Sequence, residues 1–253
     1  MTSRFTDELR LFRRVAFRAV VGSFVGKRPA GEVMRQLFEV GNRSLLFICL
    51  TLGFIGMVLV FQTCLQVSRI VGDLSQVGGE FIRILVHEFG PTLTAMMLAT
   101  RVGAGIAAEI GSMVVTEQVD ALRMSNVDPV DYLVVPRFLA CLLMTMVLAT
   151  VGIVVATGLG ALTAYLSFSV NPAIFLDPTR VRMGDIVTGI WKCLAYGAAV
   201  PIVAGYCGLS AKGGSEGVGR ATTRAVIGAS FAVIVLDFFI SAAALFTLQG
   251  VDP

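Results

Sequence analysis

The sequence predicts an all-α integral membrane protein with an N-terminal interfacial amphipathic helix and five transmembrane helices. Of its 253 residues, 56% are apolar and 15% are charged, whereas soluble domains average roughly 45–50% apolar and about 25% charged residues. The mean hydropathy is +0.83. Apolar stretches long enough to cross a bilayer, about 20 residues, recur along the chain. Little mass is left outside the membrane, which excludes a large soluble catalytic domain.

The first segment, residues 5–24, has the pattern of a basic amphipathic helix lying in the plane of the lipid headgroups. Apolar residues recur there every three or four positions, with arginines at other positions. A solvated basic tail is the alternative. Gly26 to Gly31 predicts a break before a second amphipathic stretch at residues 32–40. Because the arginines replace the apolar core of a signal peptide, we expect the N-terminus to be retained.

Five later stretches are predicted to cross the membrane. The first, residues 44–68, contains 25 consecutive uncharged residues, which is enough to span with some tilt. The other spans are predicted at about residues 81–108, 138–167, 186–209 and 225–248. The chain therefore divides into an N-terminal interfacial region, residues 1–43, and a five-span domain, residues 44–253.

A short amphipathic helix is predicted between spans two and three. Residues 113–124 are too few and too charged to cross the membrane, but Val115, Val119 and Leu122 fall on one helical face. The turn-forming residues 126–129 end this helix.

The distribution of Lys and Arg predicts the orientation. Fourteen lie on the side of the N-terminus, the short helix and the last loop, against four on the other side. By the positive-inside rule, we expect the N-terminus and the short helix to be cytoplasmic and the C-terminus to be outside.

The residues offer little support for catalysis in this chain. The five cysteines form no CxxC pair and His87 is the only histidine, so neither a disulfide framework nor a zinc site is indicated. The sequence has no GxSxG, HExxH or GxxxxGK[ST] motif, so ATP would have to be bound by a separate subunit. The net charge of +3 gives no indication of nucleic-acid binding. We expect no catalytic, metal or cofactor site.

Four ionisable residues are predicted at membrane depth, where each costs at least a few kcal/mol unless it is paired or wetted. They are Glu88, Arg101, Lys192 and Asp237. Glu88 and Arg101 are thirteen residues apart on one helix, about 20 Å along its axis, so they cannot pair with each other. Structural pairing and substrate contact both stay open, and Lys192 and Arg101 could instead reach an interface.

Small residues recur every four positions on two of the predicted spans. This pattern predicts close helix packing, within the bundle or across a dimer. The residues are Gly103, Ala107 and Gly111 on span two, and Gly152, Ala156 and Gly160 on span three. The sequence from Gly103 also fits a dinucleotide-binding GxGxxA pattern, but it follows a helix and not a strand, so we favour packing.

Several longer motifs identify a resemblance. They are Gly53-Phe-Ile-Gly56 continuing to Gln62, Glu88-Phe-Gly-Pro91, Arg101 to Gly111, Thr116-Glu117-Gln118, Asp128-Pro129 through Pro136-Arg137, Arg220-Ala-Thr-Thr-Arg224 and Leu236-Asp237-Phe238. In this order, over about residues 30–248, the chain closely resembles the MlaE/YrbE family. Its members are ABC-transporter permeases that move lipids together with MCE-domain proteins. His87 and Thr92 depart from the family pattern around the Glu-x-Gly-Pro motif.

The resemblance implies a permease subunit without enzymatic activity of its own. ATP and Mg would be bound by a cytoplasmic ABC ATPase. The other implied partners are a second permease copy, most simply in a homodimer, a periplasmic MCE-domain protein, a small STAS-domain protein and membrane lipids. The implied location is the bacterial cytoplasmic (inner) membrane, and the implied role is envelope lipid homeostasis with phospholipid as cargo. A membrane scaffold or passive pore without ATP coupling is the alternative.

The resemblance also implies roles for individual residues. The short helix would be the coupling helix that contacts the ATPase, through Thr116, Glu117, Gln118, Asp120 and Leu122. The lipid path would lie at the dimer interface, lined by spans one, two and five. Its polar elements would be Glu88, Arg101, Asp237 and Gln62.

Overall fold

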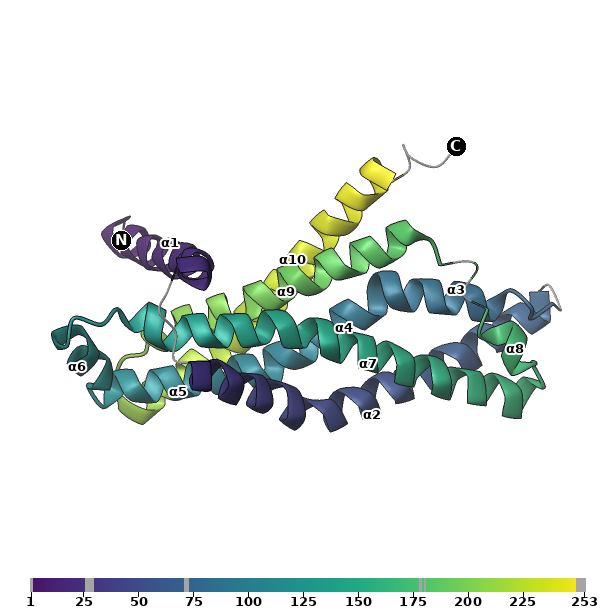
Figure 1. The fold of residues 1–253 in the computed structure, drawn as a ribbon, viewed down its shortest axis with the longest axis horizontal. Coiled ribbons are helices and arrows are strands. Elements are labelled where there is room, and N and C mark those ends of the chain that lie inside the picture. The colour runs from purple at the N-terminus through teal and green to yellow at the C-terminus, as the bar shows by residue number, and fades with distance from the viewer. Residues whose placement is uncertain (1, 26–29, 71–72, 178, 180, 249–253) are drawn as a thin grey trace.

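The computed structural model describes residues 2–25, 30–70, 73–177, 179 and 181–248, and its elements in these ranges are helices (Figure 1). Most of the predicted break at residues 26–31 lies outside the described residues. In chain order the elements are α1 (Thr2–Val25), α2 (Ala30–Ile70), α3 (Val77–Ile84), η1 (Leu85–Phe89), α4 (Gly90–Leu98), η2 (Ala99–Gly103), α5 (Ala104–Val115), α6 (Gln118–Met124), η3 (Val130–Val134), α7 (Val135–Phe168), α8 (Pro172–Phe175), α9 (Met183–Leu209) and α10 (Gly214–Leu248).

Five helical stretches in the described part of the chain are long and apolar enough to cross a membrane, as predicted. They are Gly31–Ile70, Val77–Val115, Val130–Phe168, Met183–Leu209 and Gly214–Phe246. Each is longer than the span predicted from the sequence. The second amphipathic stretch, residues 32–40, is not a separate helix but the first turns of α2, where Glu32 pairs with Arg35 at 2.6 Å. Charged ends continue a helix past the bilayer because i,i+3 and i,i+4 pairs support it in water.

Span two is one continuous rod with two π-helical turns. The first, η1, contains Glu88, and the second, η2, contains Arg101. Pro91 lies two residues after η1 and cannot donate a backbone hydrogen bond, so the regular ladder is interrupted there. The two charged residues of this span therefore both lie where the helix is irregular.

The spans pack through small residues at close range. α2 runs along α7, where an added Cβ on Gly56 would lie 2.7 Å from the carbonyl oxygen of Ala156. One on Gly152 would lie 2.2 Å from Cδ1 of Leu52, and one on Gly160 would lie 2.9 Å from Cγ2 of Val60. Such contacts let two backbones approach more closely than larger side chains would allow.

The small residues of span two face α9 and the residues just after it. A Cβ added to Gly103 would lie 3.6 Å from Cγ1 of Val200 on α9. A Cβ added to Gly111 would lie 3.4 Å from the Cβ of Ala211. Ala107 between them is completely buried. This stripe lies at the contact of span two with α9 and the residues that follow it.

The last helix, α10, leaves most of its surface uncovered. In the most apolar 18-residue stretch of this helix only 11% is buried, whereas the corresponding stretches of the other four spans are 33–44% buried. Its exposed apolar residues recur every three or four positions, at Ile227, Phe231, Ile234 and Phe238. This face is open to lipid or to another membrane chain.

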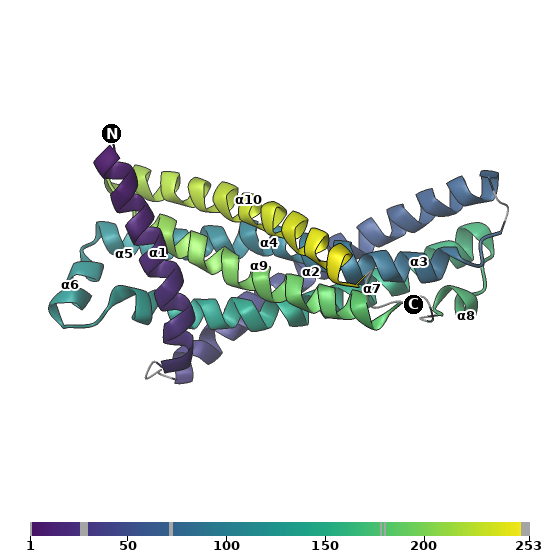
Figure 2. The same ribbon diagram turned by 90° about the horizontal axis from the view of Figure 1, so that it is seen from above.

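Helix α1 lies across the spans near the α6 end of the bundle (Figure 2). Val15 and Ala19 are completely buried, and Phe12 stacks edge-on against Tyr206 of α9 with ring centroids 5.5 Å apart. The crosswise orientation is that of a helix at a membrane surface. The apolar spacing that predicted this helix is Leu9, Phe12, Ala16, Val20 and Phe24. Because Val15 and Ala19 each lie one position before a residue of that series, the packed face is rotated from the expected one.

The short helix between spans two and three is α6, at the tip of the bundle (Figure 1). It begins later than predicted, because α5 continues to Val115 and a turn follows at Thr116 and Glu117. Glu117 has a left-handed backbone with φ of 59°, which ends one helix and starts the next in a new direction. Thr116 and Glu117 therefore belong to the turn and not to the helix.

Candidate functional site

A buried ammonium group joins span two to α9 and α10. Lys192 on α9 is completely buried, and its Nζ lies 2.9 Å from Oδ1 of Asp237 on α10. The same Nζ donates to Oε2 of Glu88 in η1. The carboxylate side chains keep 37% exposure for Glu88 and 27% for Asp237. We call these three residues the charged triad.

Hydroxyl groups complete the triad from the same three helices. Tyr196 and Thr92 donate to Oδ1 of Asp237 at 2.6 and 3.2 Å, and Ser241 donates to Oε1 of Glu88 at 3.1 Å. Each hydroxyl lies four residues after a member of the triad, on the same helical face. Each carboxylate is thereby held from two neighbouring helices.

The triad lies deep in the apolar bundle. Its members are eleven, nine and eleven residues from the helix ends that point away from α6. At a rise of about 1.5 Å per residue these separations are about 15 Å, or roughly half of a hydrocarbon layer of about 30 Å. The charges therefore lie well inside the apolar spans, where unpaired charges are costly.

This arrangement is suited to holding helices together and not to covalent chemistry. The ammonium of Lys192 is enclosed between two carboxylates, so its nitrogen is not a free nucleophile. His87 lies beside the triad, with Nδ1 at 3.0 Å from Oε1 of Glu88. No group of three His, Cys, Asp or Glu side chains among the described residues could hold a metal ion.

Arg101 does not join the triad but lies in a second polar region. It donates to Oγ of Ser44 on α2 and, with Arg43, lines a cavity of about 170 Å³ between α2, α5 and α7. The other charged residue pair there is Glu109 and Arg137, joined at 2.7 Å. Lys192 and Arg101 thus both find partners inside the bundle. For Lys192 the interfacial alternative is wrong, because the side chain is completely buried.

The remaining predicted site residues lie apart from both regions. Gln62 is exposed on α2 and is not among the partners of the triad that the structure describes. At the tip, Thr116, Glu117 and Gln118 are exposed, and Asp120 pairs with Arg123 at 2.8 Å. Leu122 is half-buried beside Val119, which is 3% exposed. These two side chains anchor α6 while its charged face points outward.

Sequence reasoning did not find the hydroxyl partners of the triad. Tyr196 and Ser241 were not expected to take part, and Thr92 was noted only as a departure from a family motif. A signal was present, because each lies four residues after an ionisable residue in an otherwise apolar stretch. Three such pairs on three spans indicate faces that meet in one polar contact.

Comparison with known proteins identifies the family. The model of the family described as Permease MlaE matches residues 33–243. A probable ABC transporter permease protein from Synechocystis is 38% identical over 85% of this chain and 82% of its own length. One from Rickettsia typhi is 33% identical over 95% of this chain and 93% of its own.

A plant relative extends the match to nearly the whole chain. The protein TRIGALACTOSYLDIACYLGLYCEROL 1, chloroplastic, from Arabidopsis thaliana is 31% identical over 98% of this chain and 72% of its own length. The family match includes the triad, the arginine-lined cavity and α6. The chain belongs to the MlaE family of ABC transporter permeases.

Proposed function

We propose that this chain is the transmembrane permease subunit of an ATP-driven lipid transporter, with phospholipid as cargo exchanged with a periplasmic MCE-domain protein. A separate cytoplasmic ABC ATPase would bind ATP and Mg. The observation that carries the proposal is the combination, in an MlaE-family chain, of a charged helix at the tip of the bundle and a charged triad tying together the spans behind it.

The geometry of α6 supports a mechanical link to an ATPase. Glu117 is exposed in the turn before α6 and Asp120 is exposed on the helix, whereas Val119 is buried. The sharp turn at Glu117 joins α6 to span two, which contains the π-helical turns η1 and η2. A push on α6 would therefore reach the span that carries Glu88 and Arg101 as a rigid-body movement.

Lipid as cargo is supported by the outer surface of the bundle. The exposed faces of α2 and α10 are apolar, with Phe54 at 61% and Phe231 at 67% exposure. Two such faces in a homodimer would enclose an apolar path for acyl chains, with the partly exposed carboxylates of Glu88 and Asp237 at its edge. The name of the Arabidopsis relative also refers to a diacylglycerol lipid.

We place the protein in the bacterial inner membrane with α1 and α6 on the cytoplasmic side and the C-terminus on the periplasmic side. The excess of Lys and Arg at the α6 end supports this orientation. A small STAS-domain protein would complete the assembly on the cytoplasmic side.

The test is to purify the tagged chain from native membranes in mild detergent and to identify its partners and lipids by mass spectrometry. ATP hydrolysis and lipid transfer are then measured for Glu117→Lys and Asp120→Lys. The matched control is Asp73→Lys, an exposed charge reversal between α2 and α3 at the other end of the molecule. We expect an ATPase, an MCE protein and phospholipid to co-purify, and only the α6 variants to lose coupled transfer.

The rival function, a scaffold or passive pore, makes a different prediction for the same experiment. A scaffold requires α6 only for assembly, so charge reversal would weaken recovery of partners without a specific loss of transfer. Full coupled transfer by an assembled Glu117→Lys, Asp120→Lys double variant would contradict the coupling role of α6.

A further inference from the structure

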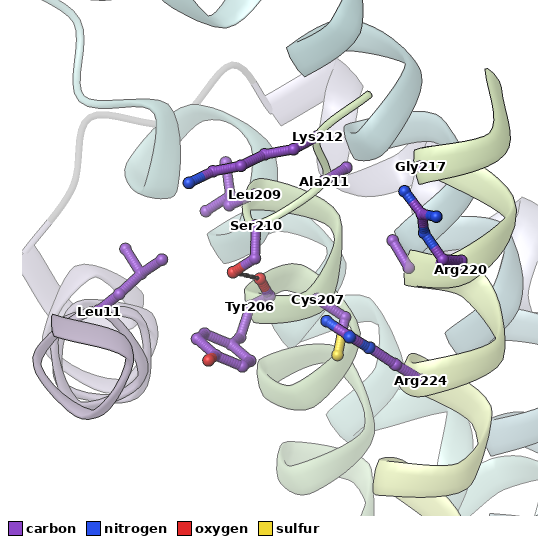
Figure 3. A pocket seen from close by; sticks show the side chains of 11 residues that line it. Leu11, Tyr206, Cys207, Leu209, Ser210, Ala211, Lys212, Gly217, Arg220 and Arg224 are labelled. Carbon is purple, nitrogen blue, oxygen red and sulfur yellow. Dashed lines mark hydrogen bonds between the residues drawn. The ribbon is translucent and has the colours of Figure 1, made fainter. Parts of the chain in front are cut away.

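A pocket with three cationic side chains lies where α1 meets the connection between α9 and α10 (Figure 3). Its volume is about 990 Å³. Lys212, Arg220 and Arg224 supply the positive charges, and no carboxylate is among the described residues that line it. Neither the charged triad nor α6 contributes to it.

Two of these cations have no carboxylate partner within the described part of the chain. Arg220 pairs with Glu216 at 2.8 Å, whereas Lys212 and Arg224 form no ion pair there. Figure 3 shows Arg224 extending from α10 toward Cys207, and Lys212 passing over Leu209 on the side of α1. The pocket thus offers a region of unneutralised positive charge.

The opposite wall of the pocket is apolar. Leu11 of α1 and Leu209 of α9 line it together with Tyr206, whose ring contacts Phe12. The pocket lies where α9 ends and α10 begins, beside α1 and at the α6 end of the bundle. A molecule held there would need an anionic group next to an apolar part.

We infer that this pocket binds the phosphate of an anionic phospholipid from the leaflet at the α6 end of the bundle. The phosphate would lie between Lys212 and Arg224, with the glycerol and upper acyl carbons against Leu11 and Leu209. Pockets for organic ligands measure about 300–1,000 Å³, so the volume suits a whole headgroup, and a free phosphate ion would fill only a small part of it. Basic residues at a cytoplasmic membrane surface favour anionic lipids.

This site is separate from the proposed transport path. Tyr206 is fourteen residues beyond Lys192 on α9, which is about 21 Å along the helix. The bound lipid would be a resident ligand that fixes α1 to the α9–α10 corner, and the inference does not rest on the transport function.

The experiment uses the purified full chain in zwitterionic phosphatidylcholine nanodiscs that contain a few per cent of photoreactive phosphatidylglycerol. After irradiation, labelled peptides are mapped by mass spectrometry. Parallel samples contain a photoreactive phosphatidylcholine probe, or an excess of inorganic phosphate as competitor. We expect phosphatidylglycerol to label α1 and the α9–α10 corner, the zwitterionic probe to label them much less, and inorganic phosphate not to compete.

Variants test the residues. Arg224→Gln should lower labelling about five-fold, and Lys212→Gln with Arg224→Gln should lower it further, because each cation near a lipid surface contributes about that factor. The matched control is Arg13→Gln, an exposed arginine on α1 that does not line the pocket. Equal labelling by the two probes, equal loss in the Arg13→Gln control, or complete competition by inorganic phosphate would overturn the inference. If the double variant does not accumulate, the comparison of probes on the unmodified chain decides.

Discussion

The ammonium of Lys192 lies 2.9 Å from a carboxylate oxygen of Asp237, so an ion pair joins α9 to α10 inside the bundle. α10 is the least buried of the five spans, since only 11% of its most apolar stretch is buried. This pair adds to the hydroxyl contacts of Asp237 and Ser241 and to the apolar packing of α10, which includes the small cluster around Val200 and Val233. A change at Lys192 would act first on the position of α10.

Replacing Lys192 by Met should leave the carboxylates of Glu88 and Asp237 without their shared cation. Removing one partner of a buried ion pair typically costs about 3–5 kcal/mol. We expect a correspondingly lower unfolding midpoint of the purified protein in detergent. Neutralising both carboxylates in the same variant, with Glu88→Gln and Asp237→Asn, should recover most of the loss. A Lys192→Met protein as stable as its parent would show that the triad does not hold the helices.

The turn at Glu117 can be separated from its charge. With φ at 59°, the residue adopts a conformation that costs an L-amino acid about 1–2 kcal/mol and that glycine adopts freely. Glu117→Gly should therefore keep the angle between α5 and α6, whereas Glu117→Val should disturb it. Thermal unfolding and ATP-coupled transfer are measured for both. If the carboxylate contacts the ATPase, Glu117→Gly should be stable but uncoupled; stable and fully coupled protein would assign the role to the turn alone.

The attachment of α1 should depend on salt. Arg18 lies 2.6 Å from Asp128 and 3.0 Å from Asp131, and Arg14 lies 3.0 Å from Asp128. Because the arginine side chains keep 41–61% exposure, we expect Arg18→Glu to destabilise the protein by only about 1 kcal/mol, and less at high ionic strength. Unfolding midpoints in low and high salt measure this. The double variant Arg18→Glu, Asp128→Arg should restore part of the stability, and an absence of any coupling between the two changes would contradict the contact.

Two glycines of the spans should respond in opposite directions to alanine. A Cβ on Gly56 would meet the backbone of Ala156 at 2.7 Å, so spans one and three would have to separate, at a cost of about 1–3 kcal/mol. A Cβ on Gly103 would meet Val200 at an ordinary 3.6 Å, and alanine favours helix by up to about 1 kcal/mol. Unfolding midpoints should therefore fall for Gly56→Ala and stay level or rise for Gly103→Ala. The reverse order would refute close packing at Gly56.

The five spans could be predicted from hydropathy because each contains a run of apolar residues that is long enough to cross a bilayer. Their ends could not, since the uncharged-run criterion excludes charged turns that continue the helix, as at Glu32 and Arg35 in α2. The start of α6 was misplaced for a related reason. Helical spacing continues through Thr116 and Glu117, and only the backbone conformation of Glu117 reveals the turn.

The charged residues of the site were predictable one at a time, but their grouping was not. Depth in an apolar run singled out Glu88, Lys192 and Asp237, because charges are rare there. Which of them meet depends on how three helices are rotated against one another, and a spacing along one helix does not contain that rotation. Arg101 illustrates the limit, since it has the same sequence signature as Glu88 and yet faces Ser44 of α2.

The two π-helical turns of span two also affect how this helix tolerates changes in length. A π turn accommodates one more residue than the regular helix needs, and one residue corresponds to about 100° of rotation about the axis. Deleting a single residue within η1 would let the rod become regular while the residues before and after it keep their faces, because the wide turn already absorbs the extra residue. The same deletion in a regular segment such as α5 would rotate everything before it by about 100° relative to the rest of the span. Span two thus holds two extra residues, and we expect single-residue deletions at its π turns to be tolerated better than deletions in its regular segments.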